Sequence, residues 1–202
     1  MRVSQCVKCG AFPCADVRHD CYLVPDVVVK PEEIRMVMIS EAAPEDSADF
    51  YYAKGDPLFA RTTVAAFRDA GVDVSSVKEI VARGVYLTTA VKCAKTGYAV
   101  ATETARECSL LLEKELALFP NLKVLMLMGD VAIKAVNCIA KRAGEKRPVP
   151  AGSTYKIRGG KFEFRGARVF PSYLQAGPSY FIEKSKRRMI AEDIHAGMKA
   201  AG

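Results

Sequence analysis

The chain has no long uninterrupted hydrophobic run, and this absence excludes two classes of protein. No apolar stretch reaches the roughly 18 residues that a membrane-spanning helix requires. The first residues also lack the apolar core of a signal peptide, so we expect a cytoplasmic protein that is neither exported nor membrane-bound. Internal repeats and low-complexity tracts are absent as well, so nothing indicates a repeat architecture.

The composition is that of a globular protein with an excess of positive charge. Half of the 202 residues are hydrophobic, which is enough for one sizeable core and predicts a single domain over residues 1–202. The formal net charge is +7. A polyanion such as DNA is therefore an expected partner, although charge alone favours nucleic acid only weakly over an ordinary basic protein. We expect the chain to be a monomer.

Seven cysteines are present, and in a cytoplasmic protein cysteines serve metal or redox chemistry more often than disulfides. Four thiolates complete a tetrahedral shell around a soft metal. Spacing alone leaves two groupings open. In the first, the CxxC pair and two distant cysteines bind together: Cys6, Cys9, Cys93 and Cys108. In the second, the distant pair are ordinary buried thiols and a local zinc site uses Cys6, Cys9, Cys14 and Cys21.

Short apolar segments predict four buried β-strands, and they alternate with segments of helical character. The strands are expected at residues 34–39, 85–91, 123–128 and 167–170, and the helices at residues 57–71, 102–120, 131–142 and 181–199. This alternation predicts an α/β fold, a three-layer α/β/α sandwich around a mainly parallel, four-stranded sheet. Residues 1–33 are expected to form an irregular, cysteine-bearing segment packed on this core. Residues 155–164 predict a β-hairpin that turns at Gly159-Gly160.

The loops after the predicted strands hold five short motifs in a fixed order, and ligands of open α/β sheets bind at such loops. The motifs are Ser40-Glu41-Ala42-Ala43-Pro44, Gly55-Asp56-Pro57-Leu58-Phe59, Thr89-Ala90-Val91-Lys92-Cys93, Met128-Gly129-Asp130-Val131-Ala132, and Pro171-Ser172-Tyr173 with Pro178-Ser179. Together with the cysteine pairs, they resemble the motifs of the uracil-DNA glycosylase superfamily, and most closely those of its iron–sulfur class, family four. The resemblance covers nearly the whole chain.

This resemblance implies a cofactor, a partner and a reaction. It favours a [4Fe-4S] cluster, with zinc as the alternative metal, bound by Cys6, Cys9, Cys93 and Cys108. The partner would be DNA, single-stranded or a damaged duplex, and the reaction would hydrolyse the N-glycosidic bond of a flipped uracil or other damaged base. Glu41 is the expected catalytic carboxylate, with Asp46 and Glu45 as second candidates, because a carboxylate can stabilise the cationic sugar or position water. A solvated acidic loop is the alternative role for all three.

The active-site motifs of this chain diverge from the family pattern at three places. Thr89 stands where the family has an Asn that reads uracil. Leu58 stands where the family has a stacking Phe, although Phe59, Phe50 or Tyr51 could supply a ring. The family's His before Pro-Ser is absent, and residues 174–177 take its place. The alternative to an enzyme is therefore a non-catalytic, iron–sulfur nucleic-acid-binding relative.

The expected DNA contacts come from polar, aromatic and basic side chains. The predicted base- and DNA-binding set is Tyr51, Leu58, Phe59, Thr89, Ser172, Gln175 and Ser179. The last three can donate hydrogen bonds to a base or a phosphate, although turn chemistry is the commoner role of such serines. Four cations of the last helix are candidates for phosphate contact, or for a merely solvated face: Lys184, Lys186, Arg187 and Arg188.

Overall fold

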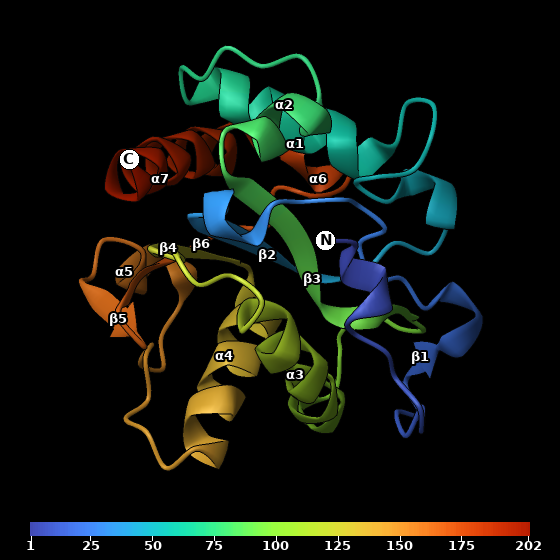
Figure 1. Ribbon diagram of the computed structural model, residues 1–202. Coiled ribbons are helices and arrows are strands. Elements are labelled where there is room, and N and C mark those ends of the chain that lie inside the picture. The colour runs from blue at the N-terminus through green and yellow to red at the C-terminus, as the bar shows by residue number, and fades with distance from the viewer.

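A six-stranded mixed sheet forms the centre of the protein, in a computed structural model that describes all residues, 1–202 (Figure 1). The strands are β1 (Val17–Arg18), β2 (Met36–Ala43), β3 (Val85–Lys95), β4 (Val124–Met128), β5 (Phe162–Phe164) and β6 (Ala167–Ser172). Their order across the sheet is β1-β3-β2-β4-β6-β5. The pairs β2–β3, β2–β4 and β4–β6 are parallel, whereas the edge strands β1 and β5 pair antiparallel.

The predicted α/β fold with a mainly parallel sheet is confirmed, but the predicted number of four strands is wrong. The four inner strands are the predicted ones, and the additional strands lie at the edges, where β1 has two residues and β5 three. Segments this short carry no hydrophobic periodicity, so only tertiary pairing defines them. β3 also runs beyond its predicted end at residue 91, because β1 pairs with Ala94 and Lys95.

Helices cover both faces of the sheet, and the side chains of β2 show how the sequence directs this (Figure 1). Met36 and Met38 pack in the apolar cluster beneath α1 (Leu58–Asp69) and α7 (Lys184–Ala201). Val37 and Ile39 point to the other face and pack beneath α3 (Thr102–Leu116) and α4 (Asp130–Arg142). All four are fully buried, because successive side chains of a central strand alternate between two covered faces.

The remaining helical segments are short. They are α2 (Val77–Ala82), α5 (Thr154–Ile157) and α6 (Ser179–Ile182), with single 3-10 turns at Val3–Gln5, His19–Cys21, Pro31–Glu33 and Ser47–Asp49. None of the helices combines the length and the apolar character that crossing a membrane would require.

The hairpin predicted around Gly159-Gly160 is wrong. Residues 154–157 form α5, and the hairpin lies further along the chain, where β5 pairs with β6. Its turn residues, Arg165 and Gly166, both have positive φ, 49° and 82°. Positive φ at both positions is the backbone of a type I′ turn, which matches the twist of the flanking strands. An Arg in the first position gives no turn signal in the sequence, whereas a Gly-Gly pair does.

Residues 1–33 form mostly irregular structure that is tied to the core at specific points. β1 pairs with the end of β3. The carboxylate of Asp16 accepts hydrogen bonds from the backbone N–H of Ala101, at 2.7 Å, and from the hydroxyl of Thr104. The stretch that precedes β1, including Cys14, therefore lies against β3 and the first turn of α3.

Candidate active site

A polar cavity of about 290 Å³ lies at the carboxyl ends of β2, β4 and β6, where the sequence predicts the functional site. We call it the Glu41 pocket. The parallel pairing of these strands brings their following loops to one edge of the sheet, together with the start of α7. Its lining includes Glu41, Gly129, Tyr173, Ser179, Lys186 and Arg187.

Glu41 reaches this cavity across a glycine. Its side chain lies so close to Gly129 that a Cβ on this residue would stand 2.5 Å from Glu41 Oε1 and 2.8 Å from Glu41 Cγ. The backbone of Gly129 has φ 104° and ψ 169°, a combination that is essentially restricted to glycine. Gly129 therefore ends β4, leads into α4 and leaves the space that the carboxylate occupies.

Two cations of α7 line the same cavity. Lys186 pairs with Glu183 at 2.6 Å, and its Nζ lies 5.5 Å from the centre of the Tyr173 ring. Arg187 binds Asp69 of α1 and holds the pKa of that carboxyl below its usual range. Arg187 is thus fixed by an internal partner, whereas Lys186 pairs only with its neighbour on the helix surface. Two other predicted cations do not line the cavity: Lys184 and Arg188.

The predicted base-reading positions lie in a closed polar cluster on the α1 side of the sheet. Gln175 is fully buried, and its amide donates hydrogen bonds to the hydroxyls of Tyr51, at 3.1 Å, and Thr63, at 3.3 Å. Ser40 donates to the Gln175 amide oxygen at 3.2 Å. Thr89 pairs with Ser40 in the sheet register, and its buried hydroxyl has no hydrogen-bond partner. No member of this cluster lines the Glu41 pocket.

The other predicted site residues are dispersed. Ser179 lines the Glu41 pocket at the start of α6, whereas Ser172 is buried and donates to a carboxylate of α7 at 2.6 Å. Asp46 is exposed, accepts a hydrogen bond from a backbone N–H two residues later, and lies outside the pocket. Two half-buried residues at the start of α1 also lie outside it: Leu58 and Phe59. The structure thus brings Glu41 and Ser179 together, and the roles of the whole set stay predictions.

Tyr98 lines the Glu41 pocket and is not among the residues that the sequence predicts. It lies in the loop after β3 and is 98% exposed. Lys95 donates to the Tyr98 carbonyl at 2.7 Å, and its Nζ lies 5.6 Å from the centre of the ring. The available signal in the sequence is an aromatic residue in a polar loop at the carboxyl end of a strand.

A buried ion pair joins the end of β3 to α3. Lys92 and Glu115 are both fully buried, and their charged atoms lie 2.5 Å apart. Lys92 Nζ also donates to the Thr88 hydroxyl at 2.7 Å and to the Thr89 carbonyl at 2.6 Å. Glu115 accepts further hydrogen bonds from Tyr86 and Thr88. Both charges are therefore compensated, which is the condition for keeping an ion pair out of water.

Four cysteines line a second cavity, of about 220 Å³, between the N-terminal segment, β3 and α3. We call it the cysteine pocket, and its cysteines are Cys9, Cys14, Cys93 and Cys108. Cys93 and Cys108 are buried, and the other two are half-buried. Burial, with a smaller contribution from the neighbouring thiols, raises the pKa of the Cys93 thiol to about 12. The backbone N–H of Lys92 donates to Cys108 Sγ at 3.2 Å.

Four thiols around one cavity are a donor set of the kind that holds an iron–sulfur cluster. No three His, Cys, Asp or Glu side chains converge closely enough to hold one ion. A [4Fe-4S] cluster binds each thiolate through a different iron, so its four cysteine sulfurs lie farther apart than those around one zinc ion. Of the four cysteines that the sequence assigns to the cluster, Cys6 does not line the pocket.

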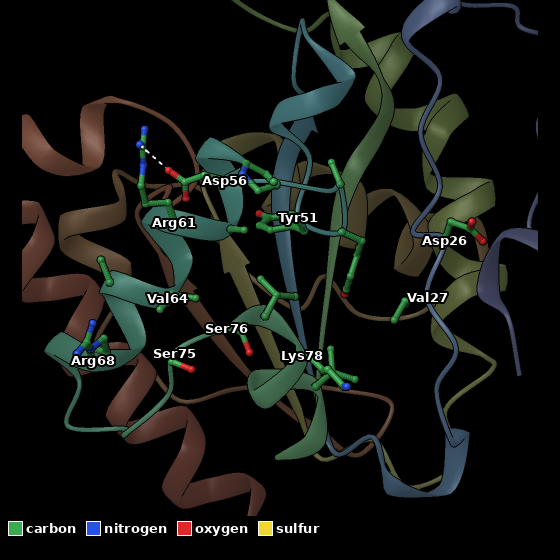
Figure 2. A pocket seen from close by; sticks show the side chains of 18 of the residues that line it. Asp26, Val27, Tyr51, Asp56, Arg61, Val64, Arg68, Ser75, Ser76 and Lys78 are labelled. Atoms are coloured by element: carbon green, nitrogen blue, oxygen red, sulfur yellow. Dashed lines mark hydrogen bonds and ion pairs between the residues drawn. The ribbon is translucent and has the colours of Figure 1, made fainter.

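A larger cavity, of about 830 Å³, lies on the flank of the sheet between α1, α2 and residues 26–28 (Figure 2). Arg61 on its rim pairs with Asp56 at 3.0 Å, as the dashed line in Figure 2 shows. Tyr51 of the predicted base-binding set lines this cavity, as do the motif residues Gly55, Asp56 and Pro57. Glu41 and the ends of β4 and β6 do not. We therefore take the smaller Glu41 pocket as the candidate active site.

Comparison with known proteins identifies the class of protein. The family model described as the uracil DNA glycosylase superfamily matches residues 28–194, which is most of the chain. The chain therefore belongs to the uracil-DNA glycosylase superfamily, as its motifs predict. Its closer resemblance to the iron–sulfur class, family four, stays a prediction.

Two of the proteins that are similar to the chain show the extent of the match. One is the type-5 uracil-DNA glycosylase of Thermus thermophilus, with 29% identity over 119 residues. That match covers 59% of this chain and 52% of the Thermus protein, so the chain spans about half the length of this curated relative. The other is the wild-type UNG of Nitratifractor salsuginis, a solved structure with 12% identity and a TM-score of 0.36, over 82% of this chain and 74% of that one.

Proposed function

We propose that the protein is a DNA glycosylase that hydrolyses the N-glycosidic bond of uracil or another damaged base flipped out of DNA. The observation that carries this proposal is the position of Glu41, whose side chain lines a polar cavity at the carboxyl ends of three parallel strands. Membership of the uracil-DNA glycosylase superfamily supports the proposed substrate class.

In the proposed reaction, the bond between C1′ of the sugar and the base nitrogen breaks and water adds to C1′. The base leaves with the bonding electrons and takes up a proton. Because positive charge develops on the sugar, the Glu41 carboxylate can stabilise that charge or orient the water. Lys186 lines the same cavity and can bind a DNA phosphate. Flipping costs least in single-stranded or mismatched DNA, so these are the expected substrates.

A non-catalytic DNA-binding relative is the second candidate, and one observation favours it. Thr89 and Gln175, which stand at or near the family's base-reading positions, are fully buried in the closed cluster with Tyr51. A base reaches them only if this cluster opens. Such a protein would bind DNA through Lys186 and Tyr98 and leave the glycosidic bond intact.

Single-turnover excision by anaerobically prepared protein tests the proposal, with uracil and other damaged bases in single-stranded and duplex oligonucleotides. Glu41→Gln is expected to slow base release about a hundredfold or more, the scale of one well-placed electrostatic group, while DNA affinity stays unchanged. Glu163→Gln is the matched control, because Glu163 is exposed on β5, outside the Glu41 pocket. If the parent protein binds DNA but releases no base from any lesion, the proposed glycosylase activity is wrong and the non-catalytic DNA-binding function takes its place.

The Asp46→Asn variant tests whether Asp46, rather than Glu41, is the catalytic carboxylate. Because Asp46 is exposed and lies outside the Glu41 pocket, its replacement should slow excision less than Glu41→Gln. A larger effect of Asp46→Asn would transfer the proposed role to that residue.

A further inference from the structure

We propose that Cys14, and not Cys6, completes the ligand set of a [4Fe-4S] cluster in the cysteine pocket, together with Cys9, Cys93 and Cys108. The assignment rests on which thiols face one cavity and which cannot reach it. It concerns the metal centre alone and does not depend on the proposed glycosylase activity.

Cys14 is held over the pocket by contacts that need no metal. Two residues later, the Asp16 carboxylate accepts hydrogen bonds from the backbone N–H of Ala101 and the hydroxyl of Thr104, both at the start of α3. The backbone carbonyl of Asp16 accepts from the N–H of Thr96 at 3.1 Å, just beyond β3. The chain around Cys14 is therefore fixed against the two elements that carry Cys93 and Cys108.

Cys6 is directed away from the pocket by the packing of its neighbours. Val3 and Val7 are both buried in the main apolar cluster, and the 3-10 turn that joins them leaves Cys6 exposed. The Cys6 thiol contacts the carbonyl of Arg2 at 3.7 Å. Arg2 in turn pairs with Asp26 at 2.8 Å. Two buried side chains, Val3 and Val7, thus anchor the turn that exposes Cys6.

The surroundings of the four thiols suit a cluster of net negative charge. The backbone N–H of Lys92 donates to Cys108 Sγ, and hydrogen bonds to the sulfurs are one of the features that tune iron–sulfur centres. Two cations, Lys8 and Lys114, and one carboxylate, Glu107, also line the cavity. Apolar neighbours, including Phe12, close it from the side of the N-terminal segment.

A cluster in this position would join three separate parts of the chain. Cys9 and Cys14 belong to the irregular N-terminal segment, Cys93 to β3 and Cys108 to α3. Because metal binding to such a site is also folding free energy, cluster loading should stabilise the N-terminal segment more than the rest of the protein.

Matched serine variants of the 202-residue chain test the ligand set after anaerobic reconstitution with iron and sulfide. The parent, Cys6→Ser and Cys138→Ser should each retain about four irons per chain and the brown colour, as the cluster type requires. Cys14→Ser should lose both. Cys138 is the remote control, since it lies on α4 outside the cysteine pocket. Iron loss in Cys6→Ser with retention in Cys14→Ser overturns the assignment, as does equal loss in both variants or a zinc-loaded, iron-free parent.

Thiol mapping of the parent tests the same assignment without any variant. Under anaerobic conditions, brief alkylation of the cluster-loaded protein followed by mass mapping should modify Cys6 and spare Cys14. Removing the iron with a chelator should make Cys14 reactive and leave the modification of Cys6 unchanged. Protection of Cys6 and labelling of Cys14 in the loaded protein would overturn the proposal, whether or not any variant folds.

Discussion

Gly129→Ala should damage both stability and the proposed excision, for two separable reasons. At φ 104° and ψ 169°, a non-glycine backbone carries strain of about 1–3 kcal/mol. For a chain of this size, that corresponds to a fall in melting temperature of roughly 2–12 °C. The added Cβ would also stand 2.5 Å from Glu41 Oε1, so the carboxylate must move. A displacement of about 1 Å from a productive geometry can slow a reaction about a hundredfold.

Thermal unfolding and single-turnover excision, measured on the same preparations, distinguish the two effects. Gly71→Ala is the matched control, because Gly71 has φ 81° but open space where its Cβ would lie. The Gly71→Ala variant should have a lower melting temperature than the parent and the same rate of base excision. In a Glu41→Ala background, Gly129→Ala should cost less stability, because the clash is gone and only backbone strain is left. If Gly129→Ala keeps the parent rate in an active protein, the close approach of Glu41 has no role in excision.

Two further predictions concern residues that only the structure brings forward. Lys92→Met should destabilise the fold by about 3–5 kcal/mol, a melting-temperature loss of roughly 6–20 °C, because Glu115 then stays buried without its cation. Adding Glu115→Leu to this variant should recover part of the lost melting temperature. If Lys92→Met alone costs less than about 1 kcal/mol, the pair behaves like an exposed salt bridge and the reasoning is wrong. Tyr98→Ala should weaken single-stranded DNA binding about 5- to 150-fold in a titration, because one ring that stacks on a base contributes on that scale. Its melting temperature should be unchanged, because the Tyr98 side chain is 98% exposed. Tyr98→Phe should restore the affinity, and equal affinity of Tyr98→Ala and the parent would remove the ring from the interface.

The inner sheet could be predicted from local pattern, whereas its edges could not. Segments such as residues 36–39 and 124–128 are apolar throughout because both faces of the strand are covered, and that composition is visible in the sequence. β1 and β5 have too few residues to carry a pattern, and they exist because a neighbouring strand offers them hydrogen bonds. The turn at Arg165 and Gly166 is likewise set by the pairing of β5 with β6, not by the strongest local turn signal.

The sequence by itself determined the superfamily and the order of the motifs. These depend on residue order and on periodicity, which survive without coordinates. The sequence placed Glu41 on the loop after the first inner strand, whereas β2 continues through Glu41 to Ala43. Only the tertiary structure decided which side chains share a cavity. Spacing could not show that Cys14 lines the cysteine pocket and Cys6 does not, because Cys6 is exposed where Val3 and Val7 enter the core. It also could not show that Gln175 is enclosed while Tyr98 is exposed, because burial is fixed by packing between elements far apart in the chain.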